Sequence, residues 1–221
     1  MTAWPVGARA AGMTAADDRG GTGERRRRGR RLEERLSRED WAEAALQALA
    51  EQGPRGINVV ALARRLDVAR GSFYWHFRNR EELLREALRR WRKRSTTDYI
   101  AALRRLASPR ERLRRLLLEA FVHEPAGRMF VAVAVAAEEP LVAEALEAAV
   151  RERLAFLEET FEALGCPPQE ARHRARLLHE TYVGLWQTER ALGERFAALF
   201  APDGLEAHLR FLFETMASEA C

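Results

Sequence analysis

The chain has 221 residues, of which 47% are hydrophobic and 32% charged, and its formal net charge is +4. This length is enough for one large domain, or for a small domain followed by a medium one. The longest apolar run, MFVAVAVAA at residues 129–137, is about half the length of a membrane-spanning helix, and the N-terminus lacks the apolar stretch of a signal peptide. These features exclude an integral membrane protein, and we expect a cytoplasmic protein without a membrane partner.

The charge is distributed unevenly along the chain. Residues 25–94 contain 20 Lys and Arg against 10 Asp and Glu, whereas residues 95–221 contain 15 against 20. Part of the arginine excess reflects compositional bias, because Lys93 is the only lysine. A basic segment joined to an acidic remainder still indicates a polyanion-binding module attached to a second domain.

Residues 1–33 show no apolar periodicity and are rich in Gly, Ala, Thr and Arg. This composition predicts a disordered basic arm. Its ERRRRGRR run either adds contacts to a nucleic-acid backbone or minor groove or is a solvated tail. Met13 is an alternative start of the protein, and the sequence leaves both questions open.

Residues 34–95 contain a series of short helices with clear start signals. Ser37, with Asp40 three residues later, predicts a capped helix that ends at the GPRG turn of residues 53–56. Asn58 caps a second, short helix, and Asp67 can take the left-handed conformation that the following tight turn needs. A third short helix follows, and a fourth begins at Asn79 and extends to about residue 106.

The third short helix carries the sequence RGSFYWHF at residues 70–77. One face of a short helix cannot bury so many rings. Phe73 and Phe77 lie four positions apart and are expected to face inward. The residues expected to project toward solvent are Arg70, Ser72, Tyr74 and His76, with Trp75 along the edge.

The remaining residues show no convincing strand. Pro109 predicts a helix start, and residues 129–137 predict a helix buried on most sides. Further helices are expected at about 140–164, 168–191 and 203–218. The apolar faces of the last two suggest a dimer surface formed by Leu177, Leu178, Leu185, Leu209, Leu212, Phe213 and Met216.

Two short helices joined by a tight turn and packed by a third form a helix-turn-helix, whose second helix enters the DNA major groove. Arg70 can bond guanine in a bidentate manner, and Ser72 can bond a base edge or a phosphate. Tyr74 and His76 suit phosphate oxygens. The alternative is a buried aromatic cluster without a ligand, but the capped helices, the basic charge and the spacing favour DNA binding.

The segment INVVALARRLDVARGSFYWHFRNREELL at residues 57–84 resembles the DNA-binding region of the TetR family of transcriptional regulators, and the resemblance covers about residues 37–95. It implies a homodimeric repressor that binds a palindromic operator in double-stranded DNA and is released by a small-molecule effector. It also implies that Trp75 contacts the DNA and that Arg80 grips phosphate. The complete expected DNA-binding set is Asn58, Arg70, Gly71, Ser72, Tyr74, Trp75, His76 and Arg80.

The expected architecture is all-α, with a helix-turn-helix domain at residues 34–95 and a helical effector-binding and dimerisation domain at residues 96–221. Candidate effector-pocket residues, each of which is alternatively an ordinary core residue, are Phe121, His123, Met129, Phe130, His179, Tyr182 and Trp186. No catalytic or metal-binding motif is present, so we expect neither an enzyme nor a cofactor. An alternative function is an orphan or architectural DNA-binding protein without an effector. The effector, the operator, the regulated genes and the choice between repression and activation are beyond the sequence.

Overall fold

A computed structural model describes residues 36–122, 124–200 and 204–217, and all regular secondary structure in these ranges is helical. The predicted all-α fold, with an N-terminal helix-turn-helix followed by a C-terminal helical domain, is confirmed. The arm predicted at residues 1–33 and the candidate residue His123 lie outside the described residues. No helix in the described part of the chain is long and apolar enough to span a membrane.

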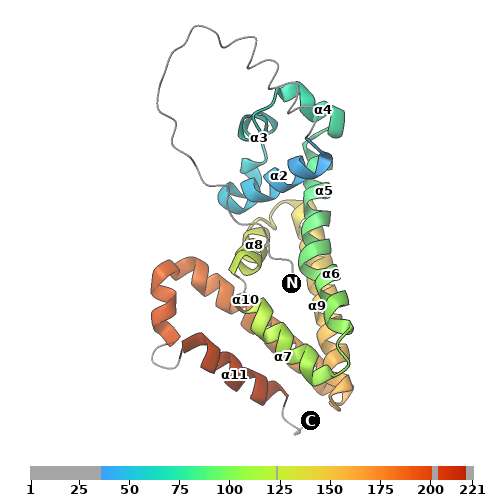
Figure 1. The fold of residues 1–221 in the computed structure, drawn as a ribbon, viewed down its shortest axis with the longest axis vertical. Coiled ribbons are helices and arrows are strands. Elements are labelled where there is room, and N and C mark those ends of the chain that lie inside the picture. Colours follow the sequence, from blue (N-terminus) through green and yellow to red (C-terminus); the bar gives the residue numbers. More distant parts are fainter. Residues whose placement is uncertain (1–35, 123, 201–203, 218–221) are drawn as a thin grey trace.

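The helix-turn-helix lies at one end of an elongated molecule (Figure 1). Its elements are α2 (Arg38–Gln52), η1 (Gly53–Gly56), α3 (Val59–Arg65), η2 (Arg70–Ser72), α4 (Phe73–His76) and α5 (Arg80–Arg92). The rest of the chain forms α6 (Asp98–Arg104), α7 (Pro109–Ala120), α8 (Glu124–Val135), α9 (Pro140–Ala163), α10 (Pro168–Leu192), η4 (Gly193–Phe200) and α11 (Gly204–Met216). The helices predicted for the C-terminal region therefore agree with α9, α10 and α11 to within two residues.

The predicted start signals act as caps. The Ser37 hydroxyl accepts a hydrogen bond from the Asp40 amide, and the Asp40 carboxylate accepts one from the Ser37 amide at 2.7 Å. The Asn79 side chain accepts from the Glu82 amide at 2.9 Å. These bonds satisfy amides that the first turn of a helix leaves unpaired.

The core of the helix-turn-helix is built from rings. Phe73 and Phe77 are both buried, as predicted. The Phe73 ring lies edge-on to Trp41 at 5.4 Å between centroids and stacks on Phe77 at 5.7 Å. Because Trp41 lies in α2, these contacts fix the short α4 against the longest helix of the motif.

A long helical rod connects the two parts of the molecule. The sequence predicts one helix from Asn79 to about residue 106, and α5 and α6 do lie end to end (Figure 1). Between them, residues Lys93–Thr97 form a π turn, η3. A π turn has a wider i→i+5 hydrogen-bond pattern that side-chain periodicity does not reveal.

The hydrophobic core continues from the helix-turn-helix into the C-terminal helices. Trp91 of α5 contacts Phe130 of α8, with 6.4 Å between the ring centroids. Phe130 belongs to a group of touching rings in α7–α10 that we call the aromatic cluster. Its members are Phe121, Phe130, His179, Tyr182 and Trp186.

The predicted dimer surface is largely internal. Leu178, Leu185, Leu209, Leu212, Phe213 and Met216 are all buried within the chain. Leu177 is the exception, with 53% of its surface exposed. The expectation that these side chains form a dimer surface is therefore wrong for six of the seven, because α11 packs its apolar face against α7 and α10.

Replacing Phe73 by Ala should lower the free energy of unfolding by about 3–5 kcal/mol, because the substitution leaves a cavity beside Trp41. Denaturant titration followed by circular dichroism measures this change. The neighbouring Tyr74→Ala is the control, since that ring is 54% exposed. Equal losses from the two variants would contradict the inward placement of Phe73.

The stability should also depend on His179. Burial, together with the charge of Arg153, lowers the pKa of His179 from 6.5 to about 4. The unfolded chain therefore takes up a proton near pH 6.5 that the folded chain does not take up until about pH 4. Between pH 7 and pH 5 this linkage should remove about 2 kcal/mol from the free energy of unfolding. His179→Gln should lack this contribution. Denaturant titrations of both proteins at pH 7 and pH 5 measure how much the free energy of unfolding falls between the two pH values. An equal fall in the wild type and in His179→Gln would contradict the assignment.

Candidate nucleic-acid interface

The candidate recognition helix consists of η2 and α4, residues 70–76. Arg70 and Gly71 are exposed at its start, and Tyr74 and Trp75 are exposed by 54% and 79%. The Arg70 guanidinium donates to the Tyr74 hydroxyl at 3.4 Å. Side chains with hydrogen-bonding capacity thus project from a helix whose opposite face is locked in the core.

Two other residues of this segment are less accessible than expected. His76 is half-buried. Ser72 is only 6% exposed, and its hydroxyl has no hydrogen-bond partner within the described structure. The prediction that Ser72 projects toward solvent is wrong. The first turn of the segment is a 3-10 helix, and three residues per turn rotate Ser72 toward the core next to Phe73.

Asn58 serves as the cap that its position predicts. Its side-chain oxygen accepts hydrogen bonds from the amides of Val60 and Ala61 at 2.9 and 3.3 Å. The side chain remains exposed. Its amide nitrogen, which is a donor only, is therefore still available to a phosphate oxygen.

The turn between α3 and the recognition helix has the predicted left-handed residue. Asp67 has a φ of 56°. The amides of Asp67 and Val68 return to the Arg64 and Ala63 carbonyls at 3.2 and 3.0 Å. This closes α3 tightly and sets the direction in which the recognition helix leaves the turn.

Arg80 has a different environment from the one that a phosphate contact requires. Its guanidinium donates to the Ile57 and Pro54 carbonyls at 3.1 and 2.9 Å. It also lies 3.4 Å from the carboxylate of Glu139, the N-cap residue of α9. In this conformation Arg80 holds the η1 turn against α5 and reaches the C-terminal domain instead of projecting outward.

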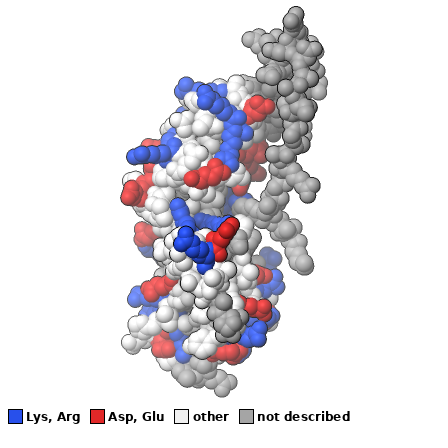
Figure 2. Space-filling view, turned by 90° about the vertical axis from the view of Figure 1, so that its left-hand side faces the viewer, with Lys and Arg blue, Asp and Glu red and all other residues white. Residues whose placement is uncertain are grey.

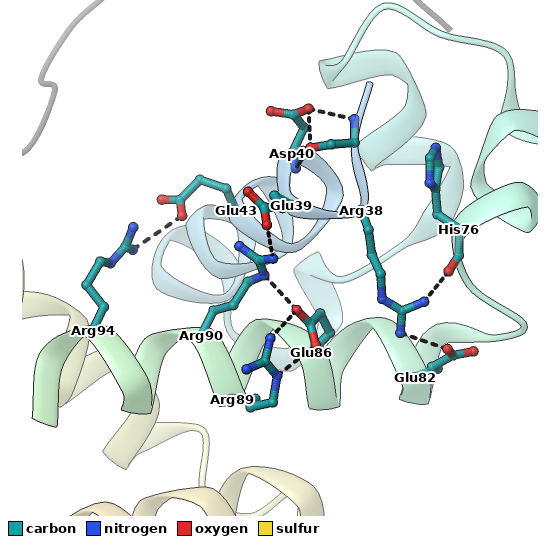
Figure 3. A network of polar contacts seen from close by, with 11 residues as sticks. Arg38, Glu39, Asp40, Glu43, His76, Glu82, Glu86, Arg89, Arg90 and Arg94 are labelled. Carbon is teal, nitrogen blue, oxygen red and sulfur yellow. Dashed lines mark hydrogen bonds and ion pairs between the residues drawn. The ribbon is translucent and has the colours of Figure 1, made fainter. Parts of the chain in front are cut away.

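Arg38 is a positioning residue that sequence reasoning missed. Its guanidinium donates to the His76 carbonyl at 2.5 Å and to the Glu82 carboxylate at 2.8 Å, as Figure 3 shows. It also lies 4.2 Å from the centre of the Phe77 ring. Arg38 therefore joins the start of α2, the end of the recognition helix and the first turn of α5. These partners are 38 and 44 residues away in sequence, so no local pattern signals them.

The same network neutralises several of the basic residues that give residues 25–94 their charge. Arg90 pairs with Glu39 at 2.6 Å and Glu86 at 2.7 Å, and Arg94 pairs with Glu43 at 3.2 Å (Figure 3). The Arg90–Glu39 pair ties α5 to α2, and the Arg94–Glu43 pair ties η3 to α2. The hydrogen bonds from Arg89 and Arg90 lower the pKa of the Glu86 carboxyl, which keeps it charged at neutral pH.

Other arginines of the helix-turn-helix are exposed and have no ion pair among the described residues. They are Arg55, Arg64, Arg70 and Arg78. Figure 2 shows basic side chains, with acidic ones between them, at the end of the molecule that the helix-turn-helix forms. Within residues 36–94, the charge available to a polyanion therefore comes mainly from these few unpaired arginines.

The structure brings the described effector candidates together. Phe121, Phe130, Tyr182 and Trp186 are buried, and Met129 and His179 are half-buried against them. The rings of the cluster contact one another. Gly127 lies flat on Trp186, and a Cβ at this glycine would be 2.0 Å from the indole ring.

Two hollows on the described surface lie elsewhere, along the exposed face of α9. They are lined by residues between Ala137 and Ala155. Neither of these two hollows includes any of the predicted effector residues.

Known proteins with the same fold are transcriptional regulators. Residues 42–87 match the family model of bacterial regulatory proteins of the tetR family. A transcriptional regulator from Rhodococcus sp. Rha1 is 26% identical, with a TM-score of 0.64 over 82% of this chain and 94% of that one. No curated protein matches the sequence.

Two further structures share the fold at lower identity. A putative regulator from Saccharomonospora viridis, in complex with choline, has a TM-score of 0.64 at 19% identity over 82% of this chain and 96% of that one. FadR from Bacillus subtilis, in complex with stearoyl-CoA, has a TM-score of 0.62 at 15% identity, over 82% of this chain and 98% of that one. Residues 42–87 thus match the tetR family model, in the same segment that forms the helix-turn-helix, and the chain shares its overall fold with these regulators.

Proposed function

We propose that this transcriptional regulator binds a specific DNA sequence through residues 70–76 and responds to a small molecule bound in its C-terminal helices. The observation that carries the DNA-binding proposal is the division of the recognition helix into two faces. Phe73 and Phe77 are locked in the core, while Arg70, Tyr74 and Trp75 are exposed on the other side. Such a helix can enter a major groove without disturbing the fold.

The roles of the exposed residues follow from their chemistry. Arg70 is the residue best suited to read a base, since its guanidinium can bond guanine in a bidentate manner. The hydroxyl of Tyr74 and the side-chain nitrogen of Asn58 suit phosphate oxygens. Gly71 has open space around its Cβ position, so the backbone can approach the DNA closely. Trp75 and His76 would complete the contact surface.

We further propose that the protein acts in the cytoplasm as a homodimer on a palindromic operator. A dimer would place two recognition helices about 34–36 Å apart, one turn of DNA. Repression relieved by an effector is the simplest mode of action. An effector that prefers the dimer with the wrong spacing would shift the population away from DNA binding. The ligands of the two similar structures, choline and stearoyl-CoA, have unlike chemistry and support ligand binding in general, not a particular ligand.

A second candidate function is an orphan regulator without a small-molecule effector. The closed packing of the aromatic cluster favours it, because the rings that would line a pocket contact one another instead. On this account the cluster is only a hydrophobic core. The two candidates differ in whether any small molecule weakens DNA binding.

Selection from a random duplex library at moderate salt tests the DNA-binding proposal. The proposal predicts enrichment of a short palindrome with half-sites about one helical turn apart. Retention of DNA that depends on salt but shows no enriched motif would mean that only the backbone is bound, and it would overturn sequence-specific recognition.

Two substitutions should separate base reading from backbone contact on the selected duplex. Arg70→Ala should relax the preference at one or two base pairs, at a cost of about 1–3 kcal/mol in binding the preferred sequence. Tyr74→Phe removes only a hydroxyl and should weaken binding to all duplexes alike. Fluorescence anisotropy with the selected duplex and single-base variants measures both effects. The same loss of specificity from both variants would refute these roles.

A further inference from the structure

Arg153 of α9 lies beside the aromatic cluster without an acidic partner. Its guanidinium is 4.5 Å from the centre of the Phe130 ring and 5.5 Å from that of Tyr182. Among the described residues, no carboxylate lies within ion-pair distance of it. Arg151, two residues earlier, is exposed and pairs with Glu147 in the ordinary way.

The polar groups around Arg153 do not compensate its charge. Burial and the charge of Arg153 lower the pKa of His179 to about 4, so this imidazole is neutral at pH 7. Burial and the nearby carboxylate of Glu119 raise the pKa of Tyr99, which keeps its phenol neutral too. An arginine stays protonated even when buried. The charge of Arg153 is therefore offset only by the phenols of Tyr182 and Tyr99 and by the Glu152 carboxylate, which lies beyond ion-pair distance. Removing such a charge from water without a close ionic partner costs free energy.

Arg153 hydrogen-bonds both to Tyr182 of the aromatic cluster and to the helical rod that connects the two parts of the molecule. Its Nε donates to the Thr96 hydroxyl at 3.0 Å, and its terminal nitrogen donates to the Ser95 carbonyl at 3.3 Å. Both residues belong to the π turn η3, and Thr96 is fully buried there. A π turn is frequently found at functional sites. Arg153 thus joins the aromatic cluster directly to the helix that continues into the DNA-binding domain.

We propose that Arg153 is the binding residue for an organic anion, namely a carboxylate carried on an aromatic body, and that this anion is the effector. The aromatic rings supply edge-on contacts for the body of the ligand. The guanidinium supplies a planar, bidentate site for the carboxylate. The hydroxyl of Tyr99 is a further donor. This inference rests on the proposed function, since it names the ligand class of the same regulator.

Binding at this place requires the rings to separate, and the anion would offset the charge of the half-buried Arg153 as it enters. A carboxylate that takes the guanidinium donors competes with Thr96 and Ser95 for them. The π turn then loses its hydrogen bonds to Arg153, and the angle between α6 and α5 can change. The anion therefore binds preferentially to a state in which the DNA-binding domain is placed differently, as an effector must.

Benzoate and benzamide are suitable probes, because they have nearly the same shape and differ in charge. Melting temperature and anisotropy with the library-selected duplex are measured for the full-length protein with each probe. Benzoate should raise the melting temperature and weaken DNA binding by about tenfold, whereas benzamide should do neither. Arg153→Met should abolish the benzoate effects, and the matched control Arg151→Met should keep them.

Arg153→Met is interpreted only if its helical circular dichroism equals that of the wild type. If it does not fold, Arg153→Lys replaces it, and this variant should lose at least several-fold in benzoate affinity because an ammonium lacks the bidentate fork. Equal effects of benzoate and benzamide, unchanged benzoate effects in the variant that folds, or no effect of benzoate on the wild type would each overturn the proposal. None of these results would affect the library selection, whose failure would instead overturn DNA recognition itself.

Discussion

Two phenyl rings set the orientation of the recognition helix on which the proposed function depends. Residues 70–76 form less than two turns of regular helix and could not hold a direction by their own backbone hydrogen bonds. Phe73 and Phe77 fix them by packing against Trp41 of α2. Arg38 closes the other end through the His76 carbonyl. Because one face is locked, the opposite face is free to carry residues chosen for recognition.

The same packing makes the DNA-binding end sensitive to the rest of the molecule. The core runs without a break from Trp41 through Trp91 and Phe130 into the aromatic cluster. Polar links follow the same route, from Arg80 to Glu139 and from Arg153 to the π turn. A change in the packing of the C-terminal helices is therefore transmitted directly to α5. Ion pairs from Glu82 and Arg90 of α5 hold α2 in place.

Local chemistry made much of the helix-turn-helix predictable. Caps, turn residues and the i,i+4 spacing of Phe73 and Phe77 act within a few residues, so the sequence reveals them. The burial of Ser72, which follows from the unexpected 3-10 turn, was not predictable in this way. Neither were the inward engagement of Arg80 and the role of Arg38, which depend on tertiary contacts. The six apolar residues predicted at a dimer surface show the same limit. An amphipathic helix predicts that its apolar face is buried, but not whether the same chain or a second one buries it. The DNA-binding and effector residues themselves stay predictions.

The central claim is that the exposed face of residues 70–76 meets the DNA, and hydroxyl-radical footprinting by mass spectrometry tests it most directly. Trp75 is 79% exposed, and Phe211 in α11 is 68% exposed at the opposite end of the molecule. The account predicts that the selected duplex strongly reduces oxidation of Trp75 and leaves Phe211 unchanged. Equal oxidation of Trp75 with and without saturating duplex would contradict it.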